Sequence, residues 1–192
     1  MKKTIKVRKE RHYLPHAEFH HAAFVHLEHA KEKHPGYFYS VLSAFLLSTF
    51  TFEAYLNYVG PLVERGWDDF DRATWRAKLR HIASIIGIQI DTTTTPLSSL
   101  VELFDFRNRM AHPRPKQIVE EYLSTPEEYQ KEFYTEPRPE WMAFATEENA
   151  RRCHEDVRAM VEIINSKLPS PDSLPLHGGS FTGSATAHGE NT

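Results

Sequence analysis

Arg107, Asn108 and His112 lie close together in the sequence and combine a fixed cation, an amide and an imidazole. An arginine stabilises negative charge on a phosphate, and a histidine takes up or releases a proton near neutral pH. RNA carries its own nucleophile, the 2′-hydroxyl, so one histidine as base and a second as acid are enough to cleave it. The pattern predicts metal-independent RNA cleavage, with Asn108 orienting the phosphate or holding the arginine.

On a helix that ends near His112, Arg107 and His112 lie about 140° apart around the axis. One chain then does not form a tight catalytic pair. Two chains that meet along this helix end would bring two arginines and two histidines into one cleft, so we expect a homodimer. Alternatively, Arg107 and Arg109 are surface cations, and His112 only caps the helix of a plain structural bundle.

The elements that must position these residues are helices, because apolar residues recur at helical spacing and no stretch alternates clearly enough for a strand. The sequence predicts an all-α fold, an antiparallel bundle of four to five helices with an acidic insertion before the last helix. The expected helices span residues 15–33, 37–65, 69–88, 96–112 and 146–168. Helix 37–65 is apolar on nearly every face, which predicts a central position in the bundle.

Local signals set the expected ends of these helices. Pro61 kinks the second helix or ends it early. Asp68 or Asp69 caps the third helix, and Thr95 caps the fourth, with Pro96 at its first position. The residue before Pro113 is pushed away from helical angles, which ends the fourth helix near His112.

The chain divides into a basic N-terminal extension (1–14), the bundle (15–168) and a tail rich in serine, glycine and proline (169–192). The tail is expected to be disordered. Residues 113–145 form a proline-rich insertion in which seven acids stand against two cations between Glu120 and Glu140. This insertion is either a lid or regulatory element, or a solvated surface loop. Within it, Thr125-Pro126-Glu127-Glu128 has a capping-box pattern that predicts a short helix.

Composition narrows the classes of protein. The formal net charge is −3, so nucleic-acid binding has to come from local patches. Cys153 is the only cysteine, which excludes an internal disulfide and favours a reduced, cytoplasmic protein. The N-terminus lacks the apolar run of a secretory signal, and the longest uncharged stretch, residues 36–52, falls short of a membrane span. We therefore expect no membrane partner.

The segment Arg107–Pro113 resembles the signature of the HEPN domain superfamily: an arginine, a polar residue that is often asparagine, and a histidine four to six positions on, at a helix end. Phe50–Asn57 also resembles the long central helix of such proteins, which often carries a glutamate and an asparagine. The resemblance covers roughly residues 16–168. It implies that Arg107 and His112 are the catalytic pair, with Asn108 as polar companion and Glu53 in support.

HEPN proteins are small helical bundles that commonly dimerise. Many are metal-independent ribonucleases of toxin–antitoxin, antiphage and RNA-processing systems, whereas others are inactive modules that bind RNA, a nucleotide or a protein. The resemblance thus implies an RNA substrate, a homodimer, an antitoxin or regulatory protein as further partner, and no cofactor or metal. One toxin subgroup has a tyrosine two positions past the histidine; Arg114 stands there in this chain, so the resemblance does not extend to that subgroup.

Several other residues are candidates. Glu53 stands in an otherwise uncharged helix, so it either pairs with Arg107 or faces solvent past the core. Arg109 and Arg114 are further candidate RNA contacts. Three arginines recur every four residues on the third helix, beside Lys78: Arg72, Arg76 and Arg80. They form either a basic ridge that follows a phosphate backbone or an ordinary solvated helix face.

Two further groups have weaker signals. His16 and His20 have a spacing compatible with a metal, but no local Asp or Cys completes a site, so we expect none. Trp141, Phe144 and Tyr134 either stack RNA bases or form a small satellite core.

Overall fold

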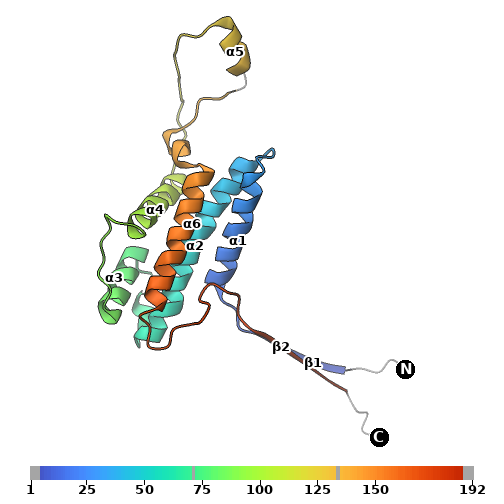
Figure 1. Ribbon diagram of the computed structural model, residues 1–192, viewed down its shortest axis with the longest axis vertical. Helices are drawn as coiled ribbons and strands as arrows, with labels where there is room; N and C mark the ends of the chain where they lie inside the picture. The colour runs from blue at the N-terminus through green and yellow to red at the C-terminus, as the bar shows by residue number, and fades with distance from the viewer. Residues whose placement is uncertain (1–4, 71, 133–134, 188–192) are drawn as a thin grey trace.

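The computed structural model describes residues 5–70, 72–132 and 135–187, and these form a helical bundle (Figure 1). The predicted all-α bundle is confirmed. Its elements are β1 (Ile5–Arg11), α1 (Pro15–Lys31), α2 (Tyr37–Val63), η1 (Trp67–Phe70), α3 (Trp75–Ile86), α4 (Leu97–Ala111), α5 (Pro126–Glu132), η2 (Glu140–Phe144), α6 (Glu147–Asn165) and β2 (Phe181–Ala187). In the described part of the chain, no helix is long and apolar enough to cross a membrane.

The apolar helix α2 lies at the centre of the bundle, as its sequence predicted, and packs against α1, α3, α4 and α6. Phe45, Phe52 and Tyr55 point from it into the core and are fully buried. Phe52 meets Phe104 of α4, whose ring stacks on Trp75 of α3 at 4.3 Å between centroids. Burying each such aromatic side chain contributes about 1.5–3 kcal/mol, so this cluster fixes α4 against α2.

Two predicted helix starts are wrong. α3 begins at Trp75 rather than near Asp69, because the hydroxyl of Thr74 accepts a hydrogen bond from the Ala77 amide at 3.3 Å and caps the helix there. Asp69 lies instead in the short 3-10 helix η1. α4 is preceded by Pro96, which makes no side-chain cap, rather than by Thr95. Pro61 lies inside α2, which ends soon after it at Val63.

Gly60 in α2 allows the indole of Trp67 to pack directly on the helix backbone. A Cβ atom at residue 60 would lie 2.0 Å from the Trp67 ring. Trp67 is only 5% exposed and its ring stacks on Phe70, so it has little room to move. We expect Gly60→Ala to lower the free energy of unfolding by about 1–3 kcal/mol, measured by urea denaturation.

The same measurement on Gly60→Ala in a Trp67→Leu background supplies the control. The smaller side chain leaves space for the added methyl group, so the effect of the alanine should shrink there. An equal effect in both backgrounds would contradict the close contact.

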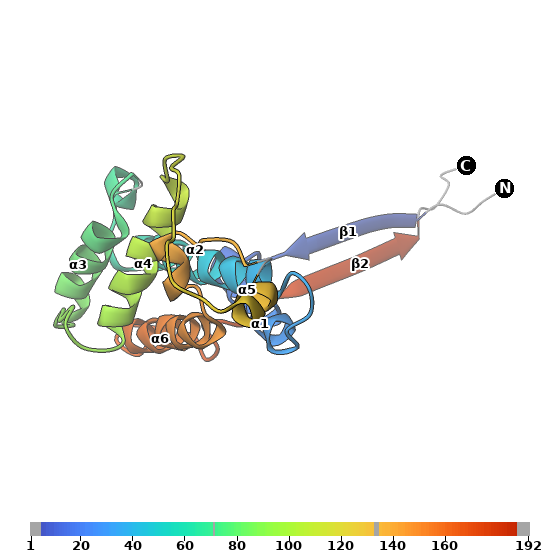
Figure 2. The same cartoon turned by 90° about the horizontal axis from the view of Figure 1, so that it is seen from above.

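The expectation that the chain has no strand is wrong. β1 and β2 pair in antiparallel fashion, with Ile5 opposite Ala187 and Arg11 opposite Phe181, and the ribbon projects away from the bundle (Figures 1 and 2). Residues 181–187, expected to be part of a disordered tail, thus form a strand. The two strands are short and come from opposite ends of the chain, so no local pattern reveals their pairing.

The insertion between α4 and α6 projects from the bundle beyond the C-terminal end of α4 (Figure 1). Its predicted capping box is confirmed. The Thr125 amide donates to the Glu128 carboxylate at 3.0 Å, and the Glu128 amide donates to the Thr125 hydroxyl at 3.3 Å. The helix that it starts, α5, continues to Glu132.

Residues that follow α6 cross the other end of the bundle before they reach β2. Asn165 exchanges two hydrogen bonds with the backbone of Asp172, at 2.8 and 3.0 Å. The Tyr58 hydroxyl donates to the Asp172 carboxylate at 2.8 Å, and the His16 ring lies 3.0 Å from the Pro175 carbonyl oxygen. These contacts hold this part of the predicted disordered tail against α1, α2 and α6.

A buried histidine, His154, and a partly buried one, His20, are expected to make the fold sensitive to acid. The rings of His20 and His154 stack at 4.3 Å between α1 and α6, and His154 lies 3.3 Å from the Ser48 hydroxyl. Loss of hydration on burial lowers the pKa of His20 to about 4 and that of His154 to about 3. In the unfolded chain both would titrate near 6.5, so below that pH the unfolded state binds more protons than the folded state.

The free energy of unfolding should therefore fall as the pH is lowered from about 6.5 towards 4, by about 1.4 kcal/mol per pH unit for each histidine. Urea denaturation at several pH values measures this slope. His20→Gln with His154→Gln should flatten it, whereas His34→Gln at an exposed position should not. A wild-type protein equally stable across this range would contradict the stacking of the two rings in their neutral form.

Candidate functional site

Helices α2 and α4 bring Glu53 and Arg107 together at the bundle surface. Nη2 of Arg107 lies 3.1 Å from both carboxylate oxygens of Glu53, and Nη1 donates to Oδ1 of Asn108 at 3.1 Å. Both charged side chains are half-buried, with exposed fractions of 28% for Arg107 and 35% for Glu53. The predicted pairing is confirmed, and the alternative, in which Glu53 faces solvent alone, is wrong.

This arrangement follows from the sequence of α2. Glu53 is the only charged residue of that helix, so its partly desolvated carboxylate requires a cation from a neighbouring helix. Phe104 and Phe106 bury the inner face of α4 and leave Arg107 at its edge, opposite Glu53. The guanidinium is therefore held in one orientation, and part of its charge is balanced by Glu53.

His112 is the residue at which α4 ends. Its backbone amide donates to the carbonyl oxygen of Asn108 at 3.2 Å, and its own φ and ψ, −125° and 31°, are no longer helical. The exposed side chain lines a cavity of about 540 Å³, together with Arg109, Pro113, Arg114, Lys116, Ile118, Pro139, Glu140 and Trp141. Proline at residue 113 ends the helix and turns the chain so that it forms a wall of this cavity.

The cavity beside His112 is basic. Arg109, Arg114 and Lys116 line it, with Glu140 as the acid among its lining residues. Two of the predicted RNA contacts, Arg109 and Arg114, are thus brought together with His112. Lys116 was missed, although the alternation of cations and prolines that begins at Pro113 continues to it and could have revealed it.

Arg107 is not among the residues that line this cavity. Asn108 lies at an adjoining cavity of about 660 Å³, which also has Arg109 in its wall. Within one chain, Arg107 and His112 therefore lie on neighbouring surfaces rather than in one cleft. This agrees with their expected separation around the helix.

The predicted basic ridge does not form a continuous face. Arg72 precedes α3, because that helix starts only at Trp75. Arg76 lies over the Trp75 ring at 4.9 Å and 3.5 Å from Asp105 of α4. Lys78 is buried and donates to Asn57 at 2.7 Å. Arg76 and Arg80 remain on α3, outside the cavity that His112 lines.

The aromatic candidates divide between two roles. The Phe144 ring packs on Phe45 and Phe106 of the main core at 5.5 and 5.3 Å, so it extends that core rather than forming the expected satellite core. Trp141 also contacts Phe106, at 6.0 Å, but it lines the cavity beside His112 and could offer its ring to a base. Tyr134 lies outside the described residues.

His16 and His20, whose spacing is compatible with a metal, contact different parts of the structure. His16 is buried against the Pro175 carbonyl oxygen, and His20 stacks on His154. In the three described ranges, no group of three or more His, Cys, Asp or Glu side chains is arranged to hold a metal ion.

If the cavity binds a phosphate backbone, reversing its cations should weaken binding. We expect Arg114→Glu with Lys116→Glu to lower the affinity for a 2′-O-methyl RNA, which cannot be cleaved, by about tenfold or more, and to flatten the dependence of affinity on salt. Fluorescence polarisation over a salt series measures both. Arg65→Glu with Lys167→Glu is the matched control, since it also reverses two exposed cations, and both lie outside the cavity. An equal loss in the control would remove the cavity from the RNA site.

Comparisons with models of known protein families, with curated proteins and with solved structures found no match.

Proposed function

We propose that this chain is a HEPN-like, metal-independent endoribonuclease that acts as a homodimer. One observation carries the proposal: α4 holds Arg107 in a fixed orientation against Glu53 and ends at an exposed His112 in a basic cavity. A fixed cation, a histidine and a phosphate-attracting cavity are the three requirements of RNA cleavage without a metal.

The reaction is a transesterification within the RNA. His112 of one protomer takes the proton of the 2′-hydroxyl, and that oxygen attacks the adjacent phosphorus. The bond from phosphorus to the 5′-oxygen then breaks, and protonated His112 of the other protomer gives its proton to this oxygen. Arg107 stabilises the additional negative charge that develops on the phosphate oxygens. The products are a 2′,3′-cyclic phosphate and a free 5′-hydroxyl.

The dimer supplies what one chain does not. Arg107 and His112 lie on neighbouring surfaces of the same helix end, so a two-fold contact across this end would place both pairs around one RNA strand. Arg109, Arg114 and Lys116 would then surround the cleft with cations. In this proposal the protein is cytoplasmic and acts as a toxin or as an antiphage or stress-defence effector, under an antitoxin or another regulatory protein.

A second candidate is a catalytically inactive HEPN-like module that binds RNA, a nucleotide or a protein. One observation favours it: the guanidinium of Arg107 is already bound by Glu53 and Asn108. In this alternative, Arg107 is structural, and the basic cavity binds a ligand without cleaving it.

The test is cleavage in EDTA of two RNAs that differ in one atom. The first is an RNA with single-stranded and structured regions, on which any scissile bond is mapped, and the second is the same RNA with a single 2′-deoxynucleotide on the 5′ side of that bond. The proposal predicts that the first is cut and the second is not, because the nucleophile is missing. Cleavage of both would contradict the reaction, and binding without cleavage of either would favour the inactive module.

A further inference from the structure

The ribbon formed by β1 and β2 carries a concentrated positive charge. Its first strand holds four cations, Lys6, Arg8, Lys9 and Arg11, against the single acid Glu10, a net charge of +3. Its second strand, Phe-Thr-Gly-Ser-Ala-Thr-Ala, has no charged residue that could balance them. All seven residues of β1 are exposed.

One face of the ribbon carries its apolar side chains. Alternate residues of a strand point to opposite faces, so the pairing register places Ile5, Val7, Ala185 and Phe181 on one side, together with the cations Lys9 and Arg11. Ile5, Val7 and Phe181 are 60%, 52% and 62% exposed. A two-stranded ribbon is only marginally stable alone in water, and an apolar face is stabilised when something covers it. The ribbon thus has the properties of a surface that binds a partner.

The acidic insertion has the complementary properties. Between Glu120 and Glu140 it contains seven acids and two cations, a net charge of −5. It also exposes large apolar side chains: Val119 is 65% exposed, and Leu123 is as exposed as in an extended chain, at 103%. Opposite charge and exposed apolar groups on both segments would allow the two to bind each other.

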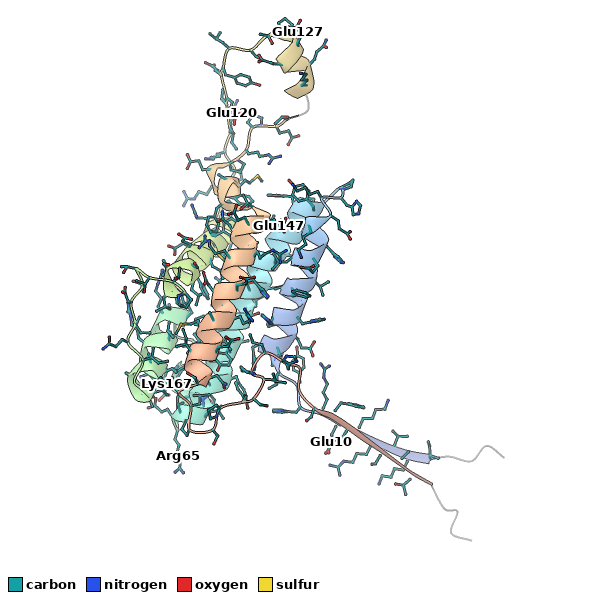
Figure 3. All side chains as sticks on the ribbon, in the orientation of Figure 1. Glu10, Arg65, Glu120, Glu127, Glu147 and Lys167 are labelled. Carbon is teal, nitrogen blue, oxygen red and sulfur yellow. The ribbon has the colours of Figure 1, made fainter. Side chains whose placement is uncertain are left out.

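The two segments of one chain lie too far apart to meet. The ribbon and the insertion project beyond opposite ends of the bundle; Figure 3 shows Glu10 on the ribbon and Glu120 and Glu127 on the insertion. Helix α6, with 19 residues, runs most of the distance between these ends and is about 28 Å long. The ribbon can therefore reach an acidic insertion only on another molecule.

We propose that the ribbon of one copy docks on the acidic insertion of a second copy. Lys9, on the same face as Ile5 and Val7, faces the glutamates of the insertion, and the apolar side chains of that face cover Val119 and Leu123. Lys6, on the opposite face, adds to the positive charge that attracts the insertion. The contact joins two different surfaces, so it can repeat from copy to copy. It is separate from the two-fold contact proposed for the ribonuclease site and does not depend on that activity.

The contact should be sensitive to salt. Its charges are exposed, so each pair contributes little and is screened as the ionic strength rises. Arg8 and Arg11 already form ion pairs with Glu10 and Glu18 of their own chain, which makes the two lysines the cleaner positions to change.

The test is a charge exchange between two full-length variants. Lys6→Glu with Lys9→Glu changes the net charge of the ribbon from +3 to −1, and Glu121→Lys with Glu127→Lys reduces that of the insertion from −5 to −1. Sedimentation velocity over a range of concentrations, at low and high salt, measures self-association. We expect wild type to self-associate with an affinity that falls as the salt concentration rises. In each variant this affinity should be about tenfold lower or more, which corresponds to the loss of roughly one to two exposed ion pairs. An equimolar mixture of the two variants should regain association.

Arg65→Glu with Lys167→Glu is the matched control, because it reverses two exposed cations on the bundle, and it should associate like wild type (Figure 3). The proposal is wrong if the ribbon variant associates like wild type, or if the mixture does not regain association. It is also wrong if reversing the ribbon lowers RNA affinity and leaves self-association unchanged, since the ribbon would then bind RNA. Because sedimentation does not require cleavage, failure of the ribonuclease proposal would not affect these outcomes.

Discussion

Replacing His112 with alanine is expected to slow RNA cleavage by about 10²–10⁴-fold, because a positioned general acid or base contributes that much. In the proposed dimer one substitution removes both the base and the acid, which places the loss towards the upper end of this range. His112 is exposed at the end of α4 and packs in no core, so the substitution should leave the free energy of unfolding nearly unchanged. Single-turnover cleavage and urea denaturation measure the two quantities.

The matched control is His34→Ala, at an exposed histidine in the turn between α1 and α2. It should cleave RNA at the wild-type rate. If His112→Ala cleaves as fast as this control, the reaction takes place elsewhere or belongs to a contaminant, and the assignment of His112 is wrong.

Replacing Arg107 should have the second-largest effect. Arg107→Ala is expected to slow cleavage by about 10²–10³-fold, the loss seen when one donor to a charged transition state is removed. Arg107→Lys should recover little of the lost cleavage activity. The planar guanidinium can contact both oxygens of Glu53 and a phosphate at once, whereas the single ammonium group of a lysine cannot. Full activity in Arg107→Lys would contradict a role for the guanidinium geometry.

Arg107 also contributes to the fold, so its two roles have to be separated. Glu53→Gln keeps the shape of the side chain but removes the charge that Arg107 balances. It should lower the free energy of unfolding by about 1–2 kcal/mol, between the values for exposed and buried ion pairs. In an Arg107→Ala background the same change should have a much smaller effect. Equal effects in both backgrounds would show that the two side chains are not energetically coupled.

The sequence predicted the parts of the fold that depend on local patterns. The apolar surface of residues 37–65 indicated the central helix, and the isolated Glu53 indicated its partner Arg107, because a partly buried carboxylate requires a cation. The capping box at Thr125 could also be predicted, because its hydrogen bonds join residues only three positions apart. By contrast, the start of α3 depends on which of several polar residues caps the helix, and Thr74 does so rather than Asp69.

The features that the sequence did not reveal depend on contacts between distant segments. β1 pairs with a strand more than 160 residues away, and Asp172 is fixed by Tyr58 of α2. The cavity beside His112 could not be predicted either, since its walls come from both ends of the insertion, at Lys116 and Trp141. The spacing of residues within α4 predicted that Arg107 and His112 lie apart around the helix axis. It could not predict which other segments surround them.

The acidic insertion has two separate surfaces of interest. Its ends form walls of the cavity beside His112, and its tip carries the surface proposed to bind the ribbon of another copy. A copy docked at the tip would bring additional cations to the same side of the molecule as the cavity. Cleavage by the ribbon variant, compared with wild type at equal concentration, would show whether association changes the activity.

We propose that His112 cleaves RNA without a metal, through attack of the 2′-hydroxyl on the adjacent phosphorus. The most direct measurement is mass spectrometry of RNA ends after incubation in EDTA with wild type and with His112→Ala, purified in parallel. We expect 2′,3′-cyclic phosphate and 5′-hydroxyl ends from wild type, and intact RNA from the variant. Ends with a 5′-phosphate, or the same cyclic ends from both proteins, would contradict it.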